Sequence, residues 1–351
     1  MTATRPGKIC LLRLSALGDV CNTVPVVRAI QRTWPESEIC WLIGRSEYRL
    51  VSGLSGVEFI VFDKRGGWTA WRRLRRQLAG RRFDALLHAQ VSARANLLAL
   101  AVRARRRIGF DRVRAHEGHS LVINERIPAV DQQHQALALL SFAEQLGADC
   151  RDIDRALPVP TEARAFAVEH QPEAGRAVLI SPASSHARRN WHAQGYAEVA
   201  DWVIGQTGRP VLLVGGPSRE EQVLGREIQQ NMRYRAGNLI GQDTLMQALA
   251  MLERAACLIT PDSGPAHFAA AQGTPVVGLY AATWSRRSGP LGSLQHCVDC
   301  YEQAALKYTG KPPEALRWGQ RLEFPGVMNL IRPEQVIQRL RPLLARQEAA
   351  G

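Results

Sequence analysis

The sequence has 351 residues, 46% of them hydrophobic, which is enough apolar material for two ordinary cores. Lys and Arg outnumber Asp and Glu by 45 to 32, and the formal charge of +13 favours an anionic partner such as nucleic acid, an anionic membrane surface or a phosphorylated substrate. No apolar run approaches the ~20 residues that cross a bilayer, and no signal peptide is evident. We therefore expect a cytoplasmic protein. The alternative explanation of its charge is that surface arginines only keep the chain soluble.

The first half of the chain alternates short β-branched runs with amphipathic stretches. Apolar residues at Val24, Val27, Ile30 and Trp34 recur at helical spacing, and Pro25 suits a first helical turn. This alternation predicts a parallel sheet that is covered by helices on both faces. The predicted strands are residues 9–14, 39–43, 59–62, 85–88 and 107–109.

The pattern loosens between about residues 149 and 175, where Pro158, Pro160, Pro172 and Gly175 favour a linker. A second series of the same kind follows, so we expect two doubly wound α/β domains, residues 1–165 and 175–332, and a final helix in 333–351. The predicted strands of the second series are residues 177–181, 210–214, 238–240, 257–260 and 275–279. Its predicted helices are residues 193–207, 220–230, 244–254, 265–272 and 333–346. Ligands of such folds bind beyond the carboxyl ends of the strands, so chemistry is expected in the turns that follow them, in a cleft between the domains.

The turn after the first predicted strand contains Gly18 and Asp19. Gly18 lets the backbone turn tightly. The dipole of the following helix would stabilise a charged carboxylate at Asp19 by about 0.3–1 kcal/mol. Spacing leaves two interpretations open: Asp19 caps the helix, or it projects into the cleft as a catalytic group.

A turn at residues 260–267 follows an apolar strand and precedes a helix whose first turn suits Pro265. Ser263 and Gly264 can expose backbone N–H groups at the helix start, where phosphate binds. Asp262 would repel phosphate, so we expect it to orient the loop or to bind a sugar hydroxyl. Spacing alone favours the alternative, an ordinary capped turn.

Two further turns combine polar side chains with strand ends. Residues 181–191 contain hydroxyls and fixed cations, among which Arg189 suits bidentate bonding of phosphate oxygens. Residues 214–221 contain two glycines that allow close approach of the backbone, and Glu220 or Glu221 could accept hydrogen bonds from ribose hydroxyls. The alternative is that these glutamates only stabilise the start of a helix.

Several other functions lack their signatures. No G-x-G-x-x-G follows the first predicted strand and no G-x-x-x-x-G-K-[ST] occurs, which weakens assignment to dinucleotide oxidoreductases or P-loop NTPases. The basic tracts at residues 72–76 and 103–107 have few aromatic neighbours, so they favour contact with phosphorylated lipid over single-stranded nucleic acid. A solvated helix face is the alternative for these tracts.

The seven cysteines are scattered and odd in number, which is typical of core residues in a reducing compartment. Cys297 and Cys300 form the single C-x-x-C, but no second pair stands at zinc spacing. A structural role is favoured for both, and no metal site is expected.

Three stretches resemble the bacterial heptosyltransferases of glycosyltransferase family nine. They are residues 12–20 (LRLSALGDV), Ser184-Ser185 with Arg189-Asn190-Trp191, and residues 261–267 (PDSGPAH), and the last, followed by GTPV at 273–276, is the most specific. The resemblance covers nearly the whole chain. It implies the GT-B architecture, in which two Rossmann-like domains face a central cleft, the first binds the acceptor, the second binds the donor, and the last helix crosses back to the first.

This resemblance also implies an activity: inverting, metal-independent transfer of heptose from ADP-heptose to the Kdo-lipid A inner core of lipopolysaccharide. The reaction would need no cofactor and would occur at the cytoplasmic face of the inner membrane, which the basic N-terminal half would contact, with no nucleic acid as partner. The alternatives are another nucleotide-sugar or acceptor on the same fold, an epimerase, a non-enzymatic sensor of nucleotide-sugars, or a nucleic-acid binder.

Carried over residue by residue, the resemblance makes Asp19 the general base, and Arg189 stands where relatives often have Lys. The residues implied to bind the donor diphosphate are Ser184, Ser185, Arg189, Asp262, Ser263 and Gly264. Those implied to bind the nucleoside or sugar are Glu220, Asp243, His267, Gly215 and Gly216. Those implied to bind the acceptor are Arg13, Ser15, Gly18, His88 and Gln90.

Overall fold

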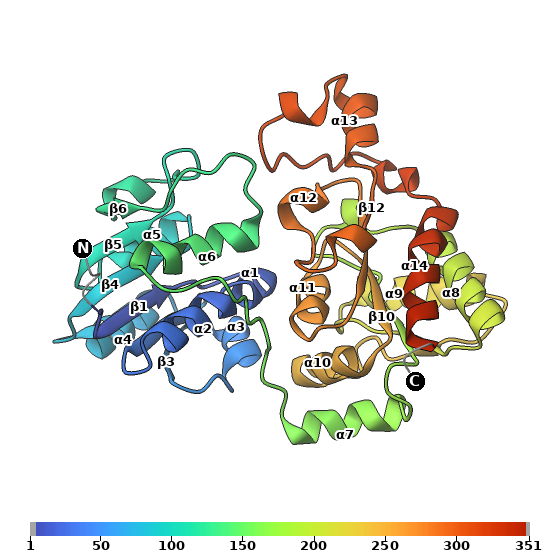
Figure 1. The fold of residues 1–351 in the computed structure, drawn as a ribbon, viewed down its shortest axis with the longest axis horizontal. Coiled ribbons are helices and arrows are strands. Elements are labelled where there is room, and N and C mark those ends of the chain that lie inside the picture. Colours follow the sequence, from blue (N-terminus) through green and yellow to red (C-terminus); the bar gives the residue numbers. More distant parts are fainter. Residues whose placement is uncertain (1–4, 349–351) are drawn as a thin grey trace. The chain divides into compact units, whose positions relative to one another are not determined.

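The fold was analysed in a computed structural model that describes residues 5–348, so the outermost residues of the predicted domains, 1–4 and 349–351, lie outside the described residues. The chain divides into two compact units, with the division between Pro158 and Val159. Figure 1 shows helices on both sides of each sheet. The predicted α/β class with parallel sheets is confirmed.

The first unit is built on a six-stranded sheet of order β3-β2-β1-β4-β5-β6, in which every pairing is parallel. Its strands are β1 Lys8–Leu12, β2 Glu38–Gly44, β3 Val57–Phe62, β4 Phe83–His88, β5 Ala104–Gly109 and β6 Glu125–Arg126. Its helices are α1 Leu17–Cys21, α2 Val24–Thr33, α3 Arg45–Val51, α4 Gly67–Leu78, α5 Ala93–Ala99 and α6 Gln135–Leu146. The strand order reverses between β1 and β4, and ligands of such folds bind beyond the carboxyl ends of the strands at this point.

The second unit repeats this arrangement, with the order β12-β11-β10-β7-β8-β9 and parallel pairing throughout. Its strands are β7 Val178–Ile180, β8 Val211–Leu213, β9 Gly237–Asn238, β10 Cys257–Pro261, β11 Val276–Tyr280 and β12 Val298–Asp299. Its helices are α7 Thr161–His170, α8 Ala193–Thr207, α9 Arg219–Asn231, α10 Leu245–Arg254, α11 Gly264–Ala271, α12 Ser285–Ser288, α13 Tyr301–Thr309 and α14 Pro333–Glu348. The strand order reverses between β7 and β10, which brings together the turns that follow these two strands.

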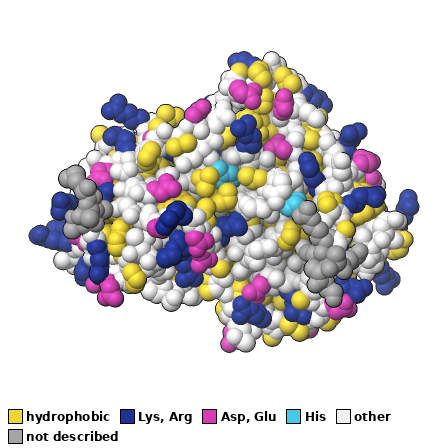
Figure 2. Space-filling view, in the orientation of Figure 1, with side chains coloured by type: hydrophobic (Ala, Val, Ile, Leu, Met, Phe, Trp, Pro, Cys, Tyr) yellow, Lys and Arg dark blue, Asp and Glu magenta, His cyan; other side chains and the backbone are white. Residues whose placement is uncertain are grey.

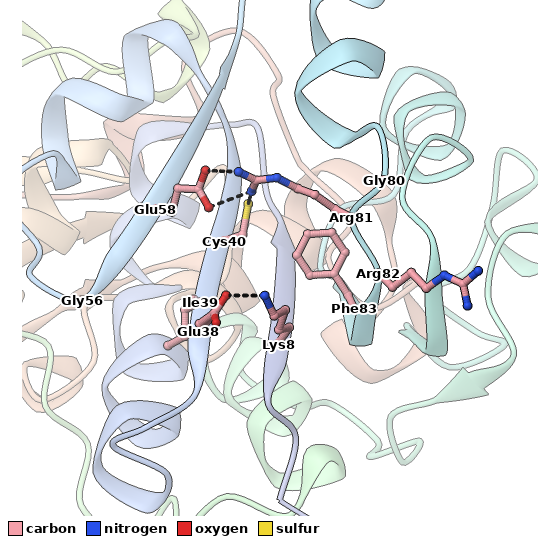
Figure 3. A pocket seen from close by; sticks show the side chains of 10 residues that line it. All are labelled: Lys8, Glu38, Ile39, Cys40, Gly56, Glu58, Gly80, Arg81, Arg82 and Phe83. Carbon is pink, nitrogen blue, oxygen red and sulfur yellow. Dashed lines mark hydrogen bonds and ion pairs between the residues drawn. The ribbon is translucent and has the colours of Figure 1, made fainter.

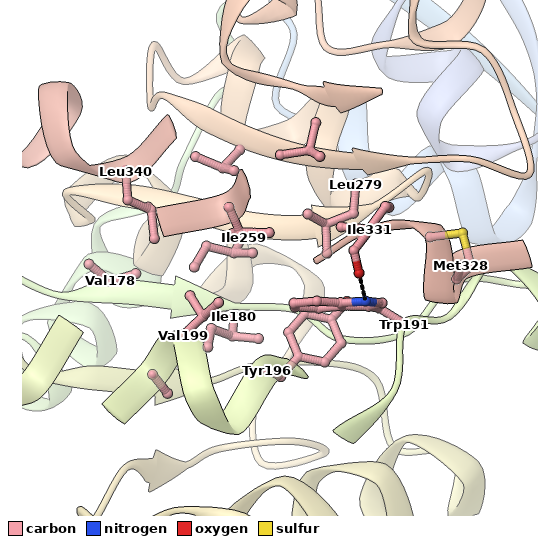
Figure 4. Packing of buried hydrophobic residues seen from close by; sticks show 14 of the residues in the cluster. Val178, Ile180, Trp191, Tyr196, Val199, Ile259, Leu279, Met328, Ile331 and Leu340 are labelled. Atoms are coloured by element: carbon pink, nitrogen blue, oxygen red, sulfur yellow. Dashed lines mark hydrogen bonds between the residues drawn. The ribbon is translucent and has the colours of Figure 1, made fainter. Parts of the chain in front are cut away.

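A buried tryptophan anchors the core of the second unit. Trp191 is 1% exposed, its Nε1 donates a hydrogen bond to the carbonyl of Ile331 at 3.1 Å, and the ring of Tyr196 packs edge-on against it (Figure 4). A Cβ at position 195 would lie 2.4 Å from the Trp191 ring, so Gly195 is needed for this close packing. Because Trp191 follows directly on the turn after β7, the same packing fixes the end of that turn.

The last helix, α14, packs within the second unit. Val336 and Leu340 on its apolar side are fully buried in that unit's core. The family resemblance implies that this helix returns to the N-terminal domain, and that expectation stays a prediction. A helix with one apolar side buries it against the nearest uncovered core, and here that core belongs to α8 and the edge of the second sheet.

Across residues 5–348, no helix combines the length and hydropathy needed to cross a bilayer. Within the described part of the chain the seven cysteines form no disulfide, and six of them are buried. Cys297 and Cys300 are among the buried ones, in line with the structural role expected for them.

Candidate active site

Asp19 lies in the first turn of α1, just beyond the carboxyl end of β1. Its Oδ1 accepts a hydrogen bond from Nε2 of Gln135 at 2.5 Å, and its Oδ2 forms an ion pair with Nη2 of Arg13. The backbone N–H of Ala16 also donates to Oδ2, at 3.4 Å, so the side chain caps α1. The side chain is nevertheless 23% exposed. Since a carboxylate offers about four lone-pair positions, these contacts orient the group and leave it able to accept a proton.

Arg13 is directed towards Asp19. Its side chain is 9% exposed, and its Nη1 donates to the carbonyl of Ala89 at 2.5 Å. The predicted contact of Arg13 with the acceptor stays a prediction. In the structure Arg13 positions the carboxylate and balances its charge.

The resemblance places His88, the last residue of β4, at the acceptor, but the structure buries its side chain. It is fully buried, and its Nε2 donates to Oδ1 of Asn96 at 2.8 Å. Burial, with a smaller contribution from nearby His119, lowers the pKa of His88 to about 3, so the ring is neutral. A side chain without exposed surface cannot touch an acceptor, and His88 is part of the support beneath the site.

Gln90 holds the turn that carries Asp19. Its Oε1 accepts the backbone N–H of Leu14 at 2.6 Å, and its Nε2 donates to the hydroxyl of Ser15 at 3.3 Å. Gln90, Ser15 and Gly18 are all partly exposed at the end of the sheet. Their contact with an acceptor stays a prediction.

In the second unit, the turn after β10 leaves the start of α11 uncapped by a side chain. Ser263 is the N-cap residue, but its hydroxyl bonds that of Thr260 at 2.9 Å and makes no hydrogen bond to the helix. The first N–H groups of α11 therefore keep their capacity to bind an anion. A Cβ at Gly264 would lie 3.2 Å from the ring of Phe268, so this position favours glycine.

Arg189, in the turn after β7, links that turn to the one after β10. Its Nε donates to Oε1 of Glu323 at 2.8 Å, and its Nη1 lies 3.9 Å from Oδ2 of Asp262. The side chain is only 10% exposed, so the guanidinium is held in a defined place. Asp262 therefore faces the Arg189 guanidinium, and both of its expected roles stay predictions. A guanidinium has five N–H donors, so these contacts leave some for a phosphate.

The hydroxyl of Ser184 donates to the carbonyl of His186 at 3.0 Å, and its backbone N–H donates to Oδ1 of Asn190 at 2.7 Å. These bonds shape the turn after β7, and Ser185 is exposed beside them. His186 lies close to the Arg189 contacts, with its Nε2 3.6 Å from Oε2 of Glu323.

At the turn after β8, Glu221 contacts the glycine turn and Glu220 does not, and the predicted contact of Glu220 with the nucleoside or sugar stays a prediction. Oε2 of Glu221 accepts the backbone N–H of Gly216 at 2.6 Å, beside Gly215, whereas Glu220 is exposed on the first turn of α9. Both glutamates therefore lie at the helix start, and the side chain that meets the glycine turn is that of Glu221. His267 lies one turn into α11, partly exposed.

Asp243 lies just before α10, and its carboxyl group has a raised pKa. Burial raises its pKa from 3.8 to about 6, and the Glu221 carboxylate adds to the rise. The folded state therefore holds this proton more tightly than the unfolded state, so the resulting stabilisation is complete below 3.8 and is lost as pH rises through about 6. We expect Asp243→Asn to reduce the pH dependence of the free energy of unfolding in this window, measured by urea titration at several pH values. Equal pH slopes for the variant and the native protein would contradict this expectation.

Residues 71–314 match the family model described as glycosyltransferase family 9 (heptosyltransferase). The chain belongs to this family. The family 9 glycosyltransferase is 36% identical, over 96% of its length, to the lipopolysaccharide core heptosyltransferase OpsX of Haemophilus influenzae, of which it covers 97%. The predicted family is confirmed.

Solved structures of low sequence identity share the fold of this family 9 enzyme. One is a family 9 glycosyl transferase from Veillonella parvula, with a TM-score of 0.79, 22% identity and 99% coverage of both chains. Another is the E. coli heptosyltransferase WaaC with ADP, with a TM-score of 0.74, 19% identity, and coverage of 96% of this chain and 99% of that one. They confirm the GT-B fold predicted from the sequence.

Two side chains of the family 9 enzyme's site escape sequence reasoning. Gln135 contacts Asp19 from a position 116 residues further along the chain, and Glu323 contacts Arg189 across 134 residues. Neither Gln135 nor Glu323 lies in a turn directly after a strand, so no local sequence pattern identifies either residue as part of the site. Among the residues that the structure describes, no cluster of three or more His, Cys, Asp or Glu side chains could hold a metal ion.

Proposed function

We propose that this glycosyltransferase moves heptose from ADP-heptose to the Kdo-lipid A inner core of lipopolysaccharide, with inversion at the anomeric carbon. The proposal is supported by the 36% identity to a lipopolysaccharide core heptosyltransferase along nearly the full length of both chains. The E. coli relative that was solved with ADP supports an adenine nucleotide as the donor's leaving group.

The observation that carries the proposal is the Asp19 carboxylate, held by Arg13 and Gln135 and yet partly exposed. Asp19 takes the proton from the acceptor hydroxyl while that oxygen attacks the anomeric carbon. The bond between this carbon and the diphosphate breaks in the same step, and ADP departs. Arg189 and the N–H groups at the start of α11 stabilise the charge that develops on the diphosphate.

A transfer assay tests the donor and the acceptor together. Purified protein with ADP-heptose and Kdo-lipid A should yield the acceptor with one added heptose and an equal amount of ADP, as followed by mass spectrometry, and the donor alone should stay unchanged. A deletion strain should make lipopolysaccharide core that lacks this heptose. A core of normal composition, or turnover only with another nucleotide-sugar, would overturn the assignment.

The proposed location is the cytoplasmic face of the inner membrane, with helix α4 as the contact. Its exposed side carries Arg72, Arg73, Arg75 and Arg76, and Arg72 lies over the ring of Trp68, which is 63% exposed. Basic side chains beside an exposed tryptophan suit anionic headgroups. Figure 2 shows Lys and Arg side chains on the surface of this unit, with acidic side chains among them.

The transfer assay also tests this contact if the acceptor is presented either in anionic vesicles or in detergent micelles. Changing the four arginines of α4 to glutamine should lower activity on vesicles and spare activity in micelles. Equal activity on vesicles for both proteins would exclude α4 as the membrane contact.

A further inference from the structure

A cavity of about 630 Å³ lies at the end of the first sheet where its parallel strands begin. Asp19 lies at the opposite end, just after β1. Its lining includes the first residues of β1, β2 and β4, namely Lys8, Glu38 and Phe83 (Figure 3). The proposed transfer reaction makes no use of this cavity. One of its lining residues is a cysteine, Cys40.

One guanidinium is directed at the Cys40 sulfur. Nη1 of Arg81 lies 3.9 Å from Sγ, and Arg81 is itself fixed by two hydrogen bonds to the Glu58 carboxylate, at 2.6 and 2.7 Å (Figure 3). The thiol of Cys10 lies beside that sulfur, opposite Cys40 on the paired strand β1. The Cys10 thiol contributes most to lowering the pKa of Cys40, and Arg81 contributes further, against the opposing effects of burial and Glu58.

Cys10 and Cys40 stand directly opposite each other on the paired strands β1 and β2, and both belong to the same core cluster. Adjacent strands are about 4.7–4.9 Å apart. Disulfides join Cα atoms that are about 4.4–6.8 Å apart, so this pair is within bonding range with little movement of the backbone.

We propose that Cys40 is an oxidation site that hydroperoxides reach through this cavity, and that Cys10 resolves the oxidised form to a disulfide. In the first step the Cys40 thiolate attacks the terminal oxygen of the hydroperoxide: an S–O bond forms and the O–O bond breaks. Hydroxide leaves from hydrogen peroxide, or alkoxide from an organic hydroperoxide, and takes up a proton. In the second step the Cys10 sulfur attacks the Cys40 sulfur: the S–S bond forms, the S–O bond breaks, and the hydroxyl group leaves with the Cys10 proton as water. The peroxide is reduced and the two thiols are oxidised.

The other cysteines provide an internal comparison. Cys150 is half-buried and therefore more exposed than Cys40, but burial and the nearby Glu144 and Asp149 raise its pKa to about 11. Burial raises the pKa of Cys21 and of Cys257 to about 12. Because the thiolate is the reactive form, exposure alone favours Cys150, whereas the contacts described here favour Cys40.

The test treats the full-length protein with hydrogen peroxide, blocks the remaining thiols with iodoacetamide, and locates the modified cysteines by peptide mass spectrometry. Cys40 should be consumed about tenfold faster than Cys150, and the product should be a Cys10–Cys40 disulfide. Cys10→Ser keeps a hydrogen-bond donor but cannot resolve, so it should accumulate Cys40 sulfenic acid that dimedone traps. Cys40→Ser should leave Cys10 unmodified.

Arg82 offers a matched control for Arg81. Both line the cavity, but Arg82 is exposed and points away from Cys40 in Figure 3. Arg81→Met should slow the oxidation of Cys40 several-fold, while Arg82→Met should leave it unchanged, and thermal unfolding should confirm that both variants are folded. Faster consumption of Cys150 than of Cys40 in the native protein, or equal rates in folded Arg81→Met and native protein, would overturn the proposal.

Discussion

Replacing Asp19 with asparagine should lower turnover about 10²- to 10⁴-fold, the range expected when a general base is removed. Asparagine keeps the size of the side chain, and its one carbonyl oxygen can still accept the hydrogen bond from Gln135, but it cannot take a proton from the acceptor. Donor affinity should stay near that of the native protein, because the donor contacts proposed here lie on other residues. The measurements are steady-state turnover with ADP-heptose and Kdo-lipid A, and calorimetric binding of ADP.

The control for this change is Glu125→Gln, in the same unit. Glu125 is ion-paired with Arg106 at 2.9 Å, and its side chain is 32% exposed, compared with 23% for Asp19. If turnover falls simply because an ion pair of this unit is lost, Asp19→Asn and Glu125→Gln will both have lower turnover. Unchanged turnover in Asp19→Asn, or an equal loss in both variants, would remove Asp19 from the role of general base. A melting curve is needed as well, since Arg13 loses its counterion in the variant.

Sequence pattern predicts the fold best where local signals and packing agree. The predicted helix at 193–207 has the same bounds as α8, because the His192 side chain caps its start and Gly208, with φ of +65°, ends it. The two-residue strands β6 and β12 escape prediction because they are too short to show a period. Helix α7 lies within the predicted linker, since only Ala163 and Ala167 of it are buried and the flanking prolines dominate the pattern.

The same reasoning applies to the site. Asp19, Arg189 and Ser263 lie in turns that follow strands, and local sequence marks such turns. Glu221, and not the neighbouring Glu220, contacts the glycine turn. Which of the two side chains faces that turn depends on the rotation of the first turn of α9, which the sequence does not show. A histidine is polar, so an exposed position is expected for His88, but its side chain is fully buried in the structure. Partners such as Gln135 depend on the tertiary fold.

Replacing Arg189 with alanine should weaken the binding of ADP by about 10- to 100-fold, since a hydrogen bond to a charged group contributes about 1.5–3 kcal/mol and each 1.4 kcal/mol is about tenfold in affinity. Arg188 is the matched control, because it adjoins Arg189 in the same turn but is exposed. Arg188→Ala should bind ADP like the native protein, as measured by calorimetry at fixed ionic strength. Wild-type affinity in Arg189→Ala would reject the role of Arg189 at the diphosphate.

The double variant Arg189→Ala with Glu323→Gln separates two causes of that loss. Alanine at 189 removes a phosphate donor, but it also leaves Glu323 and Asp262 without the cation that balances them, and their charges would then repel the diphosphate. If repulsion were the whole cause, neutralising Glu323 would restore most of the affinity. We expect only partial recovery, because the direct bonds from the guanidinium are still missing. Glu323→Gln alone should bind ADP at least as well as the native protein, since one negative charge beside the Arg189 guanidinium is then removed.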